Sequence, residues 1–172
     1  MRQLVFSLGS LFSVWVAGPR QGSPQHVAHR PVTVDSCLPT AEFQLRGVAL
    51  MSLSSEALGS LGKALRVTTD SGEDDGGRYQ VQTYHYRDLD FDDVRGFLDR
   101  LATRSPAVAT PSGVRPSLTF PVVRDLLLRH GVRVAQPADT IDITGCELDA
   151  SMILALDATH RVRAVVMAAA RP

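Results

Sequence analysis

The sequence predicts an α+β fold in which two tandem repeats share one sheet, each repeat being a short helical segment packed on an antiparallel β-meander. The first observation behind this is that the chain of 172 residues matches itself, without a gap, at an offset of 65 positions. The pairs that show the offset are Leu53/Leu118, Leu61/Leu126, Val67/Val132, Leu89/Leu154 and Asp92/Asp157. A period of this length indicates two copies of one supersecondary unit. The second and third observations are apolar residues at helical spacing, then alternating apolar and polar residues, in each copy.

The N-terminal segment reads differently from the repeats. Arg2 precedes an apolar run over residues 4–18 that is too short and too rich in Ser and Gly to span a bilayer well. A positive start, an apolar centre and small residues at its end are typical of a secretory signal peptide, which we place at residues 1–18. The alternative is an N-terminal strand or helix of the folded domain. The segment before Cys37 does not have the residues of a lipid-attachment site.

Residues 19–42 are rich in Pro, Gln, His, Arg and Ser without periodicity, and we expect an extended leader there. The first repeat then covers residues 43–107 and the second residues 108–172. We expect a periplasmic or secreted protein with no membrane insertion after signal removal.

Each repeat opens with a predicted helix. Ser54 is the expected N-cap of the first, whose apolar residues at helical spacing extend to Leu65. Thr119 is the expected N-cap of the second, with Pro121 in the first turn and a stop at Gly131.

Strands follow each predicted helix. Residues 79–91 alternate as one long strand, with Tyr79, Val81, Leu89 and Phe91 on one face, and residues 146–156 alternate in the second copy. Tight connections at 92–96 and 157–161 lead into last strands at 97–103 and 162–168. The helices would cover one face of the joined sheet and leave the other to water or a partner.

Charge and cysteine content narrow the classes of function. Lys plus Arg and Asp plus Glu each number 18, so the chain lacks the basic excess of a general nucleic-acid binder. The cysteines Cys37 and Cys146 are compatible with one disulfide in an oxidising compartment. The alternative is two buried free thiols. Two lone cysteines so far apart form no zinc or redox motif.

The opening of the second repeat, residues 110–119 continuing through Val123 to Gly131, resembles that of a known superfamily. The superfamily includes β-lactamase inhibitory protein and the small outer-membrane-assembly lipoprotein. The resemblance covers residues 43–168, with Ser117 standing where a glycine is common and 47–53 a poorer copy. It implies short helices laid on an antiparallel sheet and a protein that binds proteins and catalyses nothing. It transfers no contact residue to this chain.

Histidine and serine patterns predict neither an enzyme nor a metal or cofactor site. His26 and His29 lie in the leader, His85 in a strand, His130 at a helix end and His160 in a turn, with no zinc-ligand spacing. There is no Gly-x-Ser-x-Gly elbow. The alternative is a Ser/His/Asp triad assembled from distant positions, because triads depend on geometry and not on order.

Two surfaces are candidates for partner binding. The acidic loop at 71–77, with Asp74 and Asp75 at its centre, is interpreted as a solvated hairpin tip, a calcium site without EF-hand spacing, or a finger that enters a basic cleft of a partner.

The polar face of the long predicted strand is the second candidate. It would carry Gln82, Tyr84, Tyr86 and Asp88 beside Arg100 of the neighbouring strand. Tyr and Arg are enriched at binding hot spots, although exposed tyrosines also pack across ordinary strands.

These observations predict an exported, non-enzymatic module that binds another protein, as an inhibitor or immunity-type protein does. One alternative is a structural cell-envelope assembly factor. The other is a small hydrolase with a distributed triad.

Overall fold

The computed structural model describes residues 36–74, 76–135 and 139–170. The predicted signal peptide and most of the predicted leader therefore lie outside the described residues. The elements in chain order are η1 (Thr40–Glu42), β1 (Gln44–Leu45), β2 (Val48–Ala49), α1 (Ser54–Leu61), β3 (Arg66–Asp74), β4 (Gly77–His85), β5 (Asp90–Val94), β6 (Phe97–Thr103), α2 (Phe120–Leu128), β7 (Thr140–Thr144), β8 (Ala150–Leu156) and β9 (Val162–Ala169).

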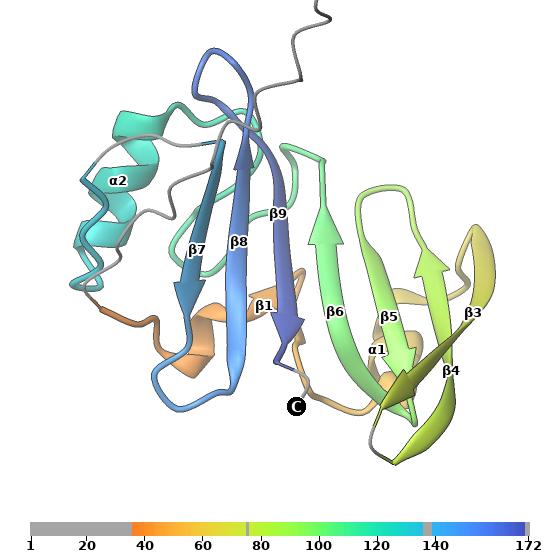
Figure 1. Ribbon diagram of the computed structural model, residues 1–172. Helices are drawn as coiled ribbons and strands as arrows, with labels where there is room; N and C mark the ends of the chain where they lie inside the picture. Colours follow the sequence, from red (N-terminus) through yellow and green to blue (C-terminus); the bar gives the residue numbers. More distant parts are fainter. Residues whose placement is uncertain (1–35, 75, 136–138, 171–172) are drawn as a thin grey trace, which may run out of the picture.

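The main sheet is antiparallel throughout, in the order β3-β4-β5-β6-β9-β8-β7 (Figure 1). The strands β6 and β9 join a four-stranded part to a three-stranded part through pairs that run from Arg100↔Ala168 to Thr103↔Val165. The small β1–β2 hairpin forms a separate two-stranded sheet. The mixed α+β class predicted from the sequence is confirmed.

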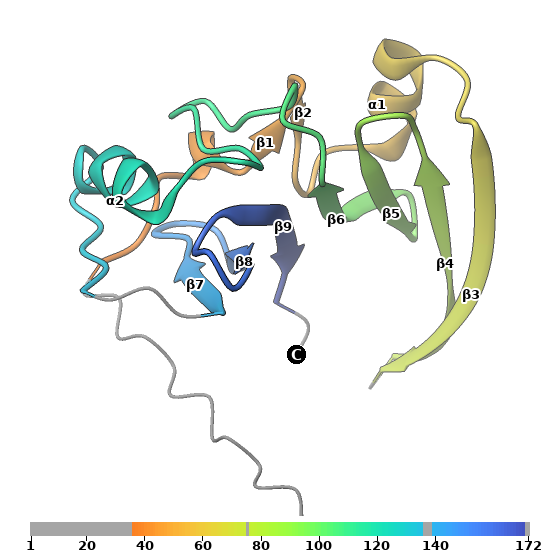
Figure 2. The same cartoon turned by 90° about the horizontal axis from the view of Figure 1, so that it is seen from above.

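Both helices and the β1–β2 hairpin lie on one side of the main sheet (Figure 2). The core lies between these two layers, and its largest fully buried side chains include Phe43, Phe91, Leu101, Ile141 and Met152. Burial of apolar side chains of this size contributes about 1.5–3 kcal/mol each relative to exposure. On the opposite side of the sheet, the part of the chain that the structure describes places no helix or strand.

The start of each helix is tied to the sheet by backbone hydrogen bonds. The Ser54 amide donates to the Gly96 carbonyl at 2.9 Å, and the Phe120 amide donates to the His160 carbonyl at 2.9 Å. Each acceptor lies in the turn just before a strand, β6 in one case and β9 in the other. These bonds satisfy amides that a helix cannot satisfy internally, and they set where the helix begins.

The predicted N-caps are only half right. Thr119 does occupy the N-cap position of α2, although its side chain makes no capping hydrogen bond. Ser54 is instead the first residue of α1, after Leu53 at the N-cap, and its hydroxyl is buried without a hydrogen-bond partner among the described residues. The backbone acceptors in the turns take over the role that the sequence assigns to side chains.

The turn before β9 is organised by Asp157. Its Oδ1 accepts hydrogen bonds from the Thr159 hydroxyl at 2.7 Å and from the amides of Thr159 and Arg161 at 2.8 and 3.0 Å. The side-chain hydrogen bond from Thr159, followed by the bond from the Arg161 amide, lowers the pKa of Asp157 below its ordinary value. This turn presents the His160 carbonyl that caps α2.

The long strand predicted at residues 79–91 is wrong. The chain reverses at residues 86–89, where the Tyr86 amide donates to the Leu89 carbonyl at 2.8 Å, and β4 and β5 form a hairpin. In that hairpin Tyr84 pairs with Phe91, so an even-numbered and an odd-numbered residue share a face. A single strand would have put them on opposite faces.

Other predicted strands are partly confirmed. The predicted last strands at 97–103 and 162–168 coincide with β6 and β9 within one residue. The strand predicted at 146–156 begins only at Ala150, because the Gly145 amide donates to the Ala150 carbonyl and closes a turn. The connection predicted at 92–96 shrinks to Arg95 and Gly96, both at positive φ. The strands β3 and β7 have no predicted counterpart.

The disulfide between Cys37 and Cys146 is confirmed, with the two Cα atoms 4.9 Å apart. Backbone hydrogen bonds from the Leu38 amide to the Thr144 carbonyl and from the Cys146 amide to the Leu38 carbonyl, both at 2.9 Å, flank it. The end of the predicted leader is thereby fixed beside the end of β7.

Buried Glu42 makes a second tie in the same region. Its Oε2 accepts a hydrogen bond from the Ser112 amide at 3.1 Å, and its Oε1 lies 3.7 Å from His130 Nε2. Only 4% of Glu42 is exposed, so these contacts compensate a carboxylate that burial would otherwise penalise. The contacts join η1 to the linker before α2 and to the end of that helix.

Removal of the disulfide should destabilise the protein without changing its fold. The bond closes a loop of 109 residues, and the chain-entropy model gives about 4–5 kcal/mol for a loop of that length. We expect Cys37→Ser/Cys146→Ser to lower the free energy of unfolding by up to this amount, measured by urea titration. An unchanged urea midpoint would show that the backbone contacts of Leu38 alone hold the segment.

Candidate functional site

The open face, by which we mean the side of the main sheet opposite the helices, has two different halves and a polar edge. The strand register places its polar half on β3 to β6, its apolar half on β6, β9 and β8, and a further polar row on β7. The polar half contains Arg66, Thr68, Asp70, Thr83, His85, Asp90, Asp92 and Arg100, with Val81 and Val94 beside Asp70 in the ladder. The apolar half contains Ala102, Val166, Ile153, Ala168, Ala164 and Ala155, beside Ser151. The row on β7 contains Thr140, Asp142 and Thr144.

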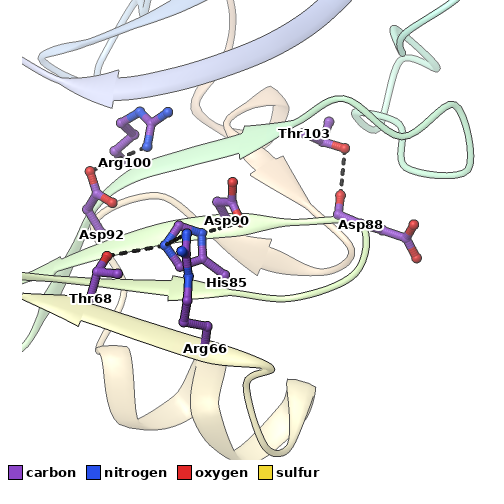
Figure 3. Close-up of polar contacts among 8 residues, drawn as sticks. All are labelled: Arg66, Thr68, His85, Asp88, Asp90, Asp92, Arg100 and Thr103. Atoms are coloured by element: carbon purple, nitrogen blue, oxygen red, sulfur yellow. Dashed lines mark hydrogen bonds and ion pairs between the residues drawn. The ribbon is translucent and has the colours of Figure 1, made fainter.

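His85 lies at the centre of the polar half (Figure 3). Its Nδ1 is 3.0 Å from Asp90 Oδ1 on β5, and its Nε2 is 3.2 Å from Thr68 Oγ1 and 3.3 Å from Arg66 Nη2 on β3. The three adjacent strands bring these side chains together because Arg66, His85 and Asp90 are paired across the ladder. Such a cross-strand cluster is the ordinary way in which a sheet places side chains from distant positions in contact.

The hydrogen bonds of His85 are consistent with one neutral tautomer. A proton on Nδ1 is donated to the Asp90 carboxylate, and the lone pair of Nε2 then accepts from Thr68 or Arg66, both of which can donate. A hydroxyl, an imidazole and a carboxylate in this order have the connectivity of a nucleophile, a base and a group that orients the base. Arg66 shares the Nε2 acceptor with the hydroxyl, and this competition weakens the resemblance to a triad.

Asp92 and Arg100 form a second pair on the same half. Arg100 Nη1 is 3.5 Å from Asp92 Oδ2, and the Asp92 side chain is only 14% exposed. The other carboxylate oxygen, Oδ1, is buried and has no hydrogen-bond partner within the described protein. A buried acceptor left in this state costs about 1–3 kcal/mol. A donor from water or a bound molecule would remove that cost.

The apolar half is made of small side chains in a continuous patch. Ala102, Val166 and Ile153 are successive partners across β6, β9 and β8, and all are at least partly covered by their neighbours. Four of its six side chains are alanine, so the patch is built mainly from short aliphatic groups. The two halves meet at Asp90 and Ala102, which are paired.

The structure does not put the predicted tyrosines on the open face. Tyr84 and Tyr86 stack on the buried ring of Phe91, with centroids 4.9 and 5.9 Å away, and pack against the core on the helix side. The Tyr86 hydroxyl donates to the Gly62 carbonyl, just after α1, at 2.9 Å. The face assignment was wrong because it continued one alternation through the reversal at 86–89.

The other predicted binding residues are dispersed. Gln82 lies beside Tyr84 and accepts its hydroxyl hydrogen at 2.7 Å, whereas Asp88 lies in the reversal and its carbonyl accepts from Thr103 at 2.6 Å. Arg100 does lie on the open face, beside Asp92. Asp74 ends β3, and Asp75 is outside the described residues. The predicted set is therefore not one site.

Sequence reasoning missed His85, Thr68 and Asp90 as a cluster. The signal was a histidine in the middle of a strand with an aspartate five residues later, but it becomes meaningful only once the hairpin between β4 and β5 is recognised. Among the described residues, no three His, Cys, Asp or Glu side chains gather in a way that could hold a metal ion. The same residues contain no helix long and apolar enough to cross a membrane.

The chain was compared with protein families, curated proteins and solved structures. No family model and no curated protein matches the chain. A solved structure similar to it is an extracellular protein containing a SCP domain from Bacillus anthracis str. Ames, with 12% identity and a TM-score of 0.42. The match covers 81% of this chain and 48% of that one, so the chain spans about half the length of the similar protein.

Tyr86 should contribute to stability through its hydroxyl. Burial, with a smaller effect from neighbouring Tyr84, raises the pKa of Tyr86 above its ordinary value of 10.0. We expect Tyr86→Phe to lower the free energy of unfolding at neutral pH by about 0.5–1 kcal/mol, because it removes a partly solvated hydrogen bond and keeps the ring.

The raised pKa also fixes the pH dependence of that difference. A raised pKa gives stability that is present below the pKa of the unfolded chain, near 10, and is lost as pH rises beyond it. The wild-type advantage over Tyr86→Phe in urea titrations should therefore narrow above pH 10. Tyr84→Phe is the control, since its hydroxyl bonds a side chain that water can replace, and an equal effect of both substitutions would contradict the assignment.

Proposed function

We propose that this protein is an exported, non-enzymatic module that binds another protein through the open face. The observation that carries the proposal is the uncovered side of the sheet, on which an apolar patch adjoins a charged ladder. Interfaces combine an apolar centre with polar groups that fix orientation, and both are present here side by side.

Export is part of the proposal and is supported by the disulfide. A disulfide persists in an oxidising compartment and is rare in the cytosol of most organisms. Together with the signal-like sequence at residues 1–18, this favours a periplasmic or secreted location. An inhibitor or immunity-type protein is the form of the proposal most consistent with a small binding module, and a structural envelope-assembly factor is the alternative.

The tandem organisation is also proposed. Met51, Ser52 and Ser54 exchange backbone hydrogen bonds with Leu98 and Gly96, and residues 117, 118 and 120 do the same with residues 162 and 160. This correspondence is what two copies of one unit related by a local two-fold axis would produce, and it supports kinship with the tandem inhibitor superfamily.

The binding surface can be tested with a matched pair of variants. Val166 lies in the apolar half, and Val122 is 46% exposed on α2, on the covered side of the sheet. We expect Val166→Glu to weaken binding at least about tenfold, because a carboxylate there would be desolvated at the interface. Val122→Glu should bind like the wild type.

The measurement begins with the tagged wild-type protein, which captures its partner from an envelope extract for identification by mass spectrometry. Titration calorimetry then gives the affinity of each variant, after circular dichroism has shown that all are folded. If Val166→Glu binds the captured partner as tightly as the wild type does, the open face is not the binding surface.

A second candidate function, hydrolysis, is favoured by the Thr68–His85–Asp90 arrangement. In that reaction the Thr68 hydroxyl would attack an ester carbonyl, and its proton would pass to His85 Nε2 and then to the leaving alcohol. A water molecule deprotonated by the same Nε2 would then attack the acyl-Thr68 ester, release the acid and return the proton to the Thr68 oxygen. We expect any such activity on a chromogenic acetate ester to fall at least about tenfold in Thr68→Val, which keeps the branched shape and loses the hydroxyl. Thr69→Val, on the same strand but on its other face, is the control. Equal rates in Thr68→Val and wild type would exclude a nucleophilic Thr68.

A further inference from the structure

The two edges of the main sheet are treated differently. At the β7 edge, the Cys37–Cys146 disulfide and the parallel bridge between Leu38 and Gly145 cover the end of the strand. At the other edge, β3 pairs only with β4, and no described element lies beyond it (Figure 2). Residues 66–71 are all exposed. An edge strand of this length, without Pro or Lys, offers unpaired backbone groups to another strand.

One hydrogen bond shows which residues of β3 turn their backbone outward. The Ser71 amide donates to the carboxylate of Asp70 at 2.8 Å. Because backbone groups alternate in direction along an antiparallel strand, the amides and carbonyls of Thr69 and Val67 face outward as well. The backbone amides and carbonyls of Thr68 and Asp70 then point toward β4.

We propose that β3 pairs antiparallel with β3 of a second copy of this chain, with Thr68 on the two-fold axis. In this register Arg66 stands opposite Asp70 of the second copy, and the symmetry repeats the pair. Opposite charges directly across two strands stabilise the pairing, and like charges oppose it. On pairing, the Asp70 carboxylate gives up its hydrogen bond from the Ser71 amide and forms an ion pair with the Arg66 guanidinium of the second copy.

Charge selects this register over its neighbours. An axis through Asp70 would place the two Asp70 carboxylates opposite each other, and an axis through Thr69 would place Arg66 opposite the uncharged Gly72. The axis through Thr68 also puts Val67 opposite Thr69, a β-branched pair suited to a sheet. Leu65, which is 76% exposed, and Val67, which is 48% exposed, are then partly covered.

The consequence goes beyond the proposed function and does not depend on it. Two seven-stranded sheets become one continuous sheet, and the polar halves of both open faces adjoin at the axis. A single copy would still carry its own open face, so loss of self-association and loss of partner binding are separable observations.

A cysteine at the axis gives the most direct test. The two copies of Thr68 would form a non-hydrogen-bonded pair of the antiparallel ladder between the copies. The Cα atoms of such a pair are about 4.5 Å apart, within disulfide range. Diagonal neighbours, such as the two copies of Thr69, are about 7–8 Å apart and outside it. We expect Thr68→Cys to give a covalent dimer under mild oxidation on a non-reducing gel, and Thr69→Cys, on the same exposed strand, to give little.

Charge exchange tests the register independently in sedimentation equilibrium of the full folded chain. Arg66→Asp and Asp70→Arg should each weaken dimerisation about tenfold or more, since each converts two attractive pairs into two repulsive ones, and the double variant should restore it. Arg124→Asp, on α2, is the control. A wild-type chain that stays monomeric up to millimolar concentration, a dimer that both single variants leave intact, or equal cross-linking of Thr68→Cys and Thr69→Cys would overturn the proposal.

Discussion

The pairing of β6 with β9 is the contact on which the rest of the molecule depends. These two strands lie at the centre of the sheet, and the pair formed by Leu101 and Met167 is completely buried. The turn before β6 caps α1 and the turn before β9 caps α2, so each helix is placed by one of the two central strands. Separation of the two strands would expose both halves of the core and leave each helix on a sheet with an open edge. The two parts of the sheet and both helices are therefore held together through this one central pair of strands.

The same arrangement explains why the two sides of the sheet differ so strongly. The side that receives the helices carries the large side chains, and the tyrosines join them there because Phe91 offers a buried ring to stack against. The open face carries mainly charged and polar side chains in its polar half and Ala, Val and Ile in its apolar half. The aromatic contacts of Tyr84 and Tyr86 thus stabilise the core, and the proposed recognition by the open face would depend on its charges and aliphatic groups. This division follows from parity alone once the β4–β5 hairpin is formed.

How much of the fold could be predicted depends on how strong a sequence pattern each element has. The spacing of apolar residues predicts the helices, β6 and β9, and the number of cysteines together with the expected compartment predicts the disulfide. The reversal at residues 86–89 has no turn signal in the sequence, because Tyr-Arg-Asp-Leu contains no Gly, Pro or Asn and the alternation of apolar and polar residues continues across it. The edge strand β3 could not be predicted for another reason. It buries little surface, so Arg66–Asp74 has no apolar pattern and carries a single large apolar residue, Val67. The reversal and β3 are the elements that bring the side chains around His85 together, so this cluster could not be predicted from the sequence.

The covalent link near the start of the described chain has a consequence for the time course of biogenesis. Cys37 leaves the ribosome 109 residues before Cys146, which at ordinary elongation speeds is a delay of roughly 5–20 s. The polypeptide that emerges in this interval contains β3 to β6 but not β9, and its thiol has no intramolecular partner. The bond can therefore form only on chains in which α2, β7 and Cys146 have already been synthesised.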